Sequence, residues 1–157
     1  MRGQLTDSMQ VHVLEGSKMK SIGGLLDEFA RVLRFPDYFG HNFNALKDCL
    51  TDLSWTGAEG HILVILDVGQ LLQRETVDDL RAFFGILAAS CGAWSSPVSG
   101  QGAWDRPARP FHALLQAAPG ERDNLLPPLN LASGLPAAQI TVGRRSPTLL
   151  RGRRGLG

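Results

Sequence analysis

One short apolar run constrains the fold of this chain more than any other stretch. His61–Val68 reads HILVILDV, and every residue in it except His61 and Asp67 has a large aliphatic side chain. Eight residues are too few for most helices, and a strand with one face in water would alternate apolar and polar residues. The run therefore predicts a central strand of a parallel sheet that is covered on both faces.

The segments on either side of this run alternate between strand and helix patterns. Strands are expected over Met9–Leu14, where apolar residues alternate, and over Phe111–Gln116. Helices are expected over Ser21–Arg34, Asn42–Leu53 and Thr76–Ser90, because each begins at a good N-cap residue and carries an apolar stripe. The order strand–helix–helix–strand–helix–strand predicts an α/β fold, in which helices pack on a small parallel sheet through right-handed crossovers.

The stretch Phe35–Trp55 combines a sharp turn with an amphipathic helix. Pro36 ends any regular structure that precedes it, Gly40 permits a sharp turn, and Asn42 is a good N-cap for the following helix. Apolar residues then recur at spacings of three and four, and they are Phe43, Leu46, Leu50 and Leu53. We expect this face of the helix to be buried.

The opposite face of the helix and the loop before it carry aromatic, amide and charged side chains. They are Asp37, Tyr38, Phe39, His41, Asn44, Lys47, Asp48 and Asp52. Such groups on a rigid turn and helix suit a positively charged partner. Taken singly, each has a simpler interpretation: Tyr38 and Phe39 as half-buried packing residues, and Asp48 as a solvated helix charge.

The same stretch resembles the signature of the barstar-like family of intracellular ribonuclease inhibitors. The signature, P-x-Y-[YF]-G-x-N-x-[DN]-A-L-x-D-C-L-T, is matched without a gap from Pro36 to Thr51, with Trp55 just beyond it. The resemblance implies a three-stranded parallel sheet with about four helices, and a protein that is not an enzyme. It further implies that the chain binds a small secreted ribonuclease, or a ribonuclease-type toxin, and plugs its active site with an acidic helix and an aromatic loop.

The resemblance also implies which residues meet the partner. Asp48 stands at the position of the carboxylate that replaces the scissile phosphate, since a carboxylate accepts several charge-assisted hydrogen bonds at once. The other implied partner-binding positions are Tyr38, Phe39, Asn42, Asn44 and Trp55.

This chain departs from the family pattern at several of these positions. Asn44 stands where an aspartate is known in the family, and Lys47 replaces an aromatic residue with a positive charge beside Asp48. Ile86 and Leu87 stand where the family often has a partner-facing glutamate. These departures bear more on the choice of ribonuclease than on the fold.

The charge of the chain is unevenly distributed. Residues 117–157 hold six arginines and two acidic residues, whereas residues 1–116 hold ten basic and thirteen acidic ones. A mildly acidic domain attracts basic proteins and repels nucleic acid. No apolar run is long enough to span a membrane, and no secretory signal, zinc spacing or phosphate loop is recognisable. We therefore expect a cytoplasmic monomer without a cofactor or metal.

The expected domain covers residues 1–116, and a long loop of about residues 91–110 interrupts it before the last strand. In the family this connection is generally short. Trp94 and Trp104 in the loop either pin it to the surface or are exposed, and the sequence leaves both options open. Residues 117–157 are rich in Pro, Gly and Arg, which predicts a disordered extension. The alternative function is an adaptor that binds nucleic acid or protein through this arginine-rich tail.

Overall fold

The computed structural model describes residues 9–121 and 139–142 of the chain. Its strands are β1 (Met9–Glu15), β2 (Gly60–Leu66), β3 (Phe111–Ala117) and β4 (Gln139–Val142), all parallel and in the spatial order β1-β2-β3-β4. The α-helices within the described residues are α2 (Ile22–Leu33), α3 (Phe43–Asp52) and α4 (Val77–Ser95). Short 3₁₀ turns are η1 (Gly16–Lys18), η2 (Ser54–Thr56), η3 (Val68–Gln70) and η4 (Gly102–Trp104). The predicted α/β architecture is confirmed, with three α-helices in this part of the chain where about four were expected.

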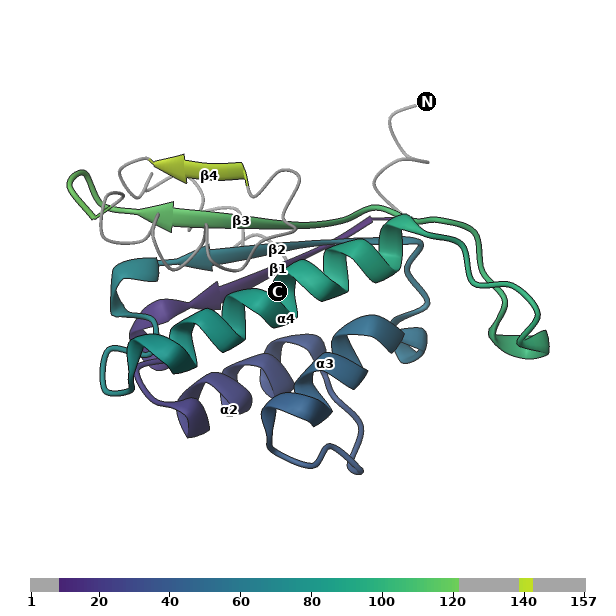
Figure 1. The fold of residues 1–157 in the computed structure, drawn as a ribbon, viewed down its shortest axis with the longest axis horizontal. Helices are drawn as coiled ribbons and strands as arrows, with labels where there is room; N and C mark the ends of the chain where they lie inside the picture. Colours follow the sequence, from purple (N-terminus) through teal and green to yellow (C-terminus); the bar gives the residue numbers. More distant parts are fainter. Residues whose placement is uncertain (1–8, 122–138, 143–157) are drawn as a thin grey trace, which may run out of the picture.

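The helices lie together along one face of the sheet (Figure 1). The predicted central strand is β2, which pairs with β1 on one side and β3 on the other. Cover on both faces was expected, but the described helices lie on one face only, and Ile62 and Val64 on the other face are half-buried. It begins at Gly60 and ends at Leu66, because Asp67 adopts a left-handed conformation with φ of 49° and turns the chain into η3. Gly16 lies directly against the Asp67 carbonyl, where a Cβ would collide, so this crossing of the chain requires glycine.

The expected N-caps form as the sequence predicts. Ser21 accepts a hydrogen bond at its Oγ from the Gly24 amide at 3.1 Å. Thr76 and Asp79 form a reciprocal capping box at the start of α4. Apolar side chains from all three helices and from β1–β3 fill the space between the two layers, including Leu14, Leu25, Phe29, Leu46, Leu50, Leu63, Ile65, Phe83, Leu87 and Leu115.

Helix α4 is longer than the sequence pattern indicates. It was expected to end at Ser90, but it continues to Ser95, and the connecting loop therefore starts at residue 96 instead of 91. The buried positions Leu87, Ser90 and Trp94 follow helical spacing, so Trp94 belongs to the inner face of the helix and not to the loop. Its side chain is only 2% exposed. The Trp104 side chain lies outside what the structure describes.

The sheet carries one strand more than expected. Gln139–Val142 pairs in parallel with β3, from Leu114↔Gln139 to Ala117↔Val142. The β-branched residues of this segment, Ile140, Thr141 and Val142, favour a strand. Residues 122–138 and 143–157, which include the predicted disordered tail and its arginine clusters, lie outside the described residues.

A pair of histidines is buried under the end of α4. The Nε2 atom of His12 lies 3.0 Å from Nδ1 of His61, and the His61 ring also packs against Trp94 at 5.3 Å between ring centroids. Burial lowers the pKa of His12. The pKa of His61 falls further, to about 4, because of its burial first and then the positive charges of His12 and Arg109.

Candidate functional site

The loop that leads into α3, residues 35–42, is held to the domain by an aromatic cluster. Phe35 meets Phe39 edge-on, with ring centroids 4.8 Å apart, and meets Trp55 at 6.0 Å. The Trp55 indole N–H donates to the Leu33 carbonyl at 3.0 Å. Phe39 is only 7% exposed and Trp55 is half-buried. These two predicted binding residues therefore anchor the loop, and each offers a partner only a small part of its ring.

Asn42 joins this loop to α3. Its Oδ1 accepts a hydrogen bond from the Ala45 amide at 2.8 Å, and its Nδ2 donates to the Gly40 carbonyl at 3.1 Å. The preceding residue, His41, is left-handed with φ of 48°. Although Asn42 is exposed, both ends of its amide serve its own backbone, so it sets the direction of α3 while lying at the surface.

The outward face of α3 carries a polar stripe. Asn44, Asp48 and Asp52 follow one another at spacings of four, which places them on one side of a helix. Asn44 and Asp48 are exposed and Asp52 is half-buried, whereas Leu46, Cys49 and Leu50 face the core as expected. We call Asn44, Asp48 and Asp52 the acidic stripe.

Tyr38 stands beside the acidic stripe. It is 73% exposed, the most of any large apolar or aromatic residue in the described part of the chain. Its pKa is raised by local desolvation first and then by the negative charges of Asp52 and Cys49. The loop and α3 therefore present an aromatic ring and acidic groups side by side.

The Asp48 carboxylate is exposed on α3. Within the described residues its side chain forms no hydrogen bond and no ion pair. Lys47, its exposed neighbour, likewise forms no ion pair there. On α4, Ile86 is half-buried and Leu87 is buried, so these positions add no charge to the surface.

The last turn of α3 is held by residues that sequence analysis did not assign to it. The carbonyls at a helix C-terminus lack partners within the helix. The Trp94 indole N–H donates to the Leu50 carbonyl at 2.8 Å, and Arg106 Nη2 donates to the Thr51 carbonyl at 3.4 Å. The Arg106 guanidinium lies over the Trp94 ring, 3.9 Å from its centroid. The end of α4 and the loop after it thus fasten the helix that carries the acidic stripe.

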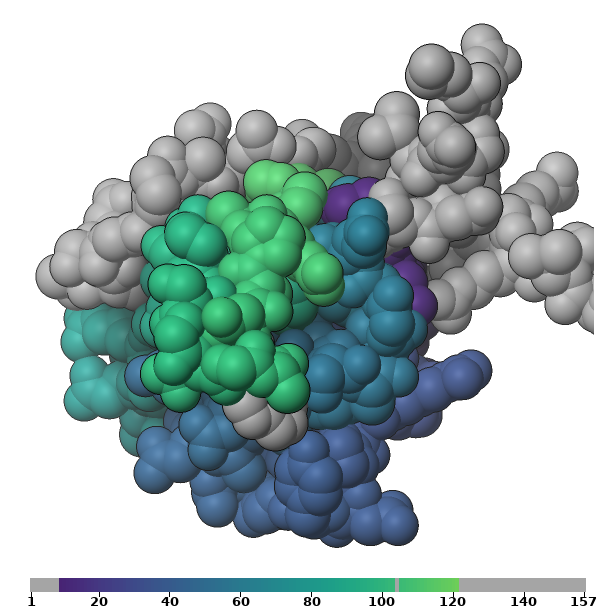
Figure 2. Space-filling view, turned by 90° about the vertical axis from the view of Figure 1, so that its right-hand side faces the viewer, coloured from purple at the N-terminus to yellow at the C-terminus, as the bar shows by residue number. Residues whose placement is uncertain are grey.

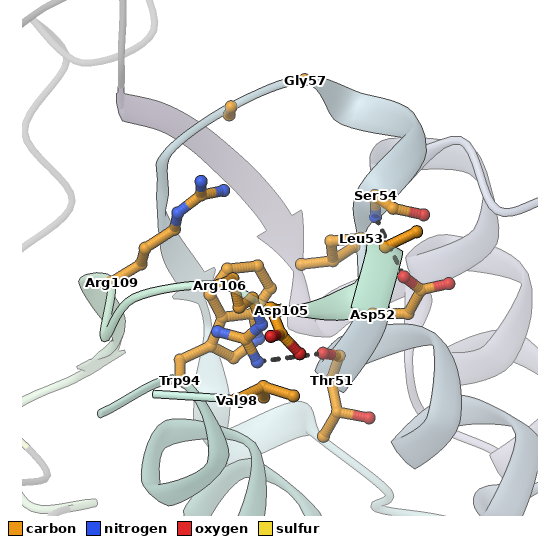
Figure 3. A pocket seen from close by; sticks show the side chains of 12 residues that line it. Thr51, Asp52, Leu53, Ser54, Gly57, Trp94, Val98, Asp105, Arg106 and Arg109 are labelled. Carbon is orange, nitrogen blue, oxygen red and sulfur yellow. Dashed lines mark hydrogen bonds between the residues drawn. The ribbon is translucent and has the colours of Figure 1, made fainter. Parts of the chain in front are cut away.

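These contacts border a pocket of about 450 Å³ (Figure 3). It lies between the end of α3, the turn that follows it, the end of α4 and the loop of residues 96–110. Figure 2 shows this loop, in green, lying against the blue surface of the segment around residues 50–60. The residues that line the pocket are Thr51, Asp52, Leu53, Ser54, Gly57, Ala58, Trp94, Val98, Ala103, Asp105, Arg106 and Arg109. No spacing in the sequence pointed to it, because the loop carries no motif.

Within residues 9–121 and 139–142 no three His, Cys, Asp or Glu residues gather as metal ligands would. No helix in this part of the chain has the length and apolar character needed to cross a membrane.

The comparison with protein families matches most of the described domain. A family model described as "Barstar (barnase inhibitor)" matches residues 9–116. The chain belongs to the barstar family. The match runs from β1 to the penultimate residue of β3, so it includes the acidic stripe, Tyr38 and the loop of residues 96–110.

One curated relative is the Bacillus subtilis (strain 168) protein named "Putative ribonuclease inhibitor YrdF". It is 42% identical to the barstar-family chain over 43 residues, which are 27% of this chain and 47% of the relative. The matched segment thus spans about half the length of that relative.

Proposed function

We propose that this barstar-family chain binds and inhibits a small ribonuclease by presenting the acidic stripe and Tyr38 to its active site. The observation that carries the proposal is the Asp48 carboxylate, which is exposed on a helix that is fixed at both ends and has no partner among the described residues. A fixed helix loses little conformational freedom on binding, so its charge is presented at low entropic cost.

The chemistry of the proposed partner explains why a carboxylate is used. A ribonuclease cleaves a phosphodiester, and cations around the scissile phosphate stabilise the charge that develops there. A carboxylate on a rigid helix occupies the same position and accepts hydrogen bonds from the same cations. The aromatic ring of Tyr38 adds a large contact area beside it.

Lys47 bears on which ribonuclease is bound. Its positive charge lies next to Asp48, and a like charge facing a basic active site weakens binding. Asn44 retains an acceptor but lacks the charge of an aspartate. We infer that the partner tolerates a less acidic inhibitor at this edge of the interface.

An inhibitor of this kind protects the cell that makes the enzyme, and we propose that it acts in the cytoplasm as a monomer. The alternative, an adaptor that works through the arginine-rich tail, depends on residues outside the described part of the chain.

The test measures inhibition of RNA hydrolysis and binding kinetics. The purified chain is titrated against barnase, which the family description names, and against any small ribonuclease encoded beside its gene. We expect stoichiometric inhibition of at least one enzyme. Asp48→Ala should lose about 2–5 kcal/mol of binding free energy, mostly through faster dissociation, because it leaves cations of the enzyme buried and unpaired.

Two variants serve as references for Asp48→Ala. Asn44→Ala should cost less, since a neutral hydrogen bond contributes less than a charge-assisted one. Asp78→Ala removes another exposed carboxylate, which pairs with Arg81 in the first turns of α4, and should leave affinity unchanged. Equal affinity of Asp48→Ala and the unaltered chain, or inhibition of none of the enzymes, would refute the proposal.

A further inference from the structure

The pocket beside α3 carries two arginines whose charges are not neutralised by ion pairs. Within the described residues neither Arg106 nor Arg109 forms a salt bridge. Arg106 Nη1 is buried and has no hydrogen-bond partner there. A buried guanidinium nitrogen that lacks an acceptor is unfavourable, so its presence needs an explanation.

The structural contacts of Arg106 use only part of its guanidinium group. Nη2 reaches the Thr51 carbonyl, and the guanidinium plane stacks on Trp94, so this residue fastens the loop to α3. Neither contact satisfies Nη1. Desolvation first and then the charge of Arg109 lower the pKa of Arg106, while the negative charge of Asp52 acts in the opposite direction. Arg106 and Arg109 line the same pocket, and two positive charges there favour an anion.

The acidic residues of the pocket limit how much negative charge it accepts. The two Asp105 oxygens accept hydrogen bonds from the backbone amides of Gly100 at 3.2 Å and Gln101 at 2.6 Å, so this carboxylate holds the loop. Asp52 also lines the pocket. Because the carboxylates of Asp52 and Asp105 repel an anion that approaches the two arginines, a singly charged anion is disfavoured less than a doubly charged phosphate.

The remaining walls are compatible with a small organic molecule. Leu53, Ala58, Val98 and Ala103 are apolar, and Ser54 and Thr51 add polar groups. A volume of about 450 Å³ lies within the range of small-molecule sites. We propose that this pocket binds a small ligand that carries one carboxylate, held by the guanidinium groups of Arg106 and Arg109 with its apolar body against Val98 and Ala103. The pocket shares Asp52 with the acidic stripe. The two arginines that would hold the ligand lie outside the stripe, so the proposal does not depend on ribonuclease binding.

The test uses benzoate as the probe and benzamide as its uncharged counterpart. Both are titrated into the full chain at constant ionic strength, while NMR follows the arginine Nε–H and tryptophan indole N–H resonances. We expect saturable shifts of the Arg106, Arg109 and Trp94 resonances with benzoate and none with benzamide. Inorganic phosphate should bind more weakly than benzoate.

Variants connect these shifts to the pocket. The Arg109 side chain makes no hydrogen bond to the rest of the described domain, so replacing it should not disturb the fold. Arg109→Gln should weaken benzoate binding by about tenfold or more, because a charge-assisted hydrogen bond to the carboxylate is lost. Arg106→Lys keeps the charge but loses the planar fork, and it should weaken binding too. Arg81→Gln is the matched control: Arg81 also has a buried nitrogen without a partner, but it lies on α4 outside the pocket, and the change should have no effect.

Three results would overturn the proposal. They are equal shifts with benzamide, unchanged affinity in Arg109→Gln, and tighter binding of phosphate than of benzoate.

Discussion

Acidification is expected to destabilise the domain through the buried histidine pair. His61 is fully buried, and its pKa is lowered from the ordinary value of 6.5 to about 4, by desolvation first and then by the charges of His12 and Arg109. Folding therefore favours the neutral ring. Below pH 6.5 the unfolded chain takes up a proton that the folded chain refuses, so stability is highest above that pH and is lost as the pH falls toward 4.

The size of the effect follows from the two pKa values. A decrease from 6.5 to about 4 corresponds to a total loss of about 3 kcal/mol, of which about 2 kcal/mol is lost by about pH 5. Since single domains are stable by only about 5–15 kcal/mol, such a loss is readily measured. The pKa of His12 is also lowered, so its contribution has the same sign.

The assay is urea denaturation of the full chain at about pH 7.5 and about pH 5, with the free energy of unfolding extrapolated to water. In His61→Leu the difference between the two pH values should shrink by at least about 1 kcal/mol. His112→Gln removes an exposed histidine from the neighbouring strand, and it should leave the difference unchanged. A His61→Leu variant that loses as much stability on acidification as the unaltered chain would refute the reasoning.

Three further changes test the interface, the support of α3 and the edge of the sheet. Lys47→Trp should tighten binding to an inhibited ribonuclease by a few-fold to about tenfold, because it removes a repulsive charge next to Asp48 and adds apolar contact; weaker binding in surface-kinetics measurements would contradict this. Trp94→Phe removes the donor to the Leu50 carbonyl and should cost about 1–3 kcal/mol of unfolding free energy, measured in urea, whereas no change would mean that water replaces the indole. Truncation after Glu121 removes β4 and should lower the free energy of unfolding by about 2 kcal/mol. One cooperative thermal transition should remain, since the core between β1–β3 and the helices is intact. Loss of that transition would show that the tail belongs to the core.

Periodic segments of the chain were predictable because local rules and burial agree there. The run that became β2 differs from its expected bounds by only one or two residues, and the caps at Ser21, Asn42 and Thr76 all form. The inward and outward faces of α3 were also predicted, since apolar residues at helical spacing leave Asp48 on the other side.

What the sequence could not resolve depends on contacts between distant segments. Tyr38 and Phe39 are adjacent aromatic residues in one loop, yet one is exposed and the other buried, because only Phe39 meets Phe35. The end of α4 was missed because Gly92 and a run of small residues hide the helical spacing that leads to Trp94. The pocket was missed because it depends on a contact between distant segments: Arg106 reaches the Thr51 carbonyl of α3 only once the chain has folded.

The two bonds that fasten the last turn of α3 also determine when the protein becomes functional during its synthesis. Trp94 and Arg106 follow their acceptors Leu50 and Thr51 by 44 and 55 residues, respectively. At about 5–20 residues per second, a ribosome takes roughly 2–10 seconds to add that much chain. Until Trp94 is made, the last carbonyls of α3 lack both donors, and until Arg106 is made they lack one of them. A nascent chain therefore has its acidic residues before it has the rigid helix that presents them. Under the proposed function, it becomes able to bind a ribonuclease only after Arg106 has been added.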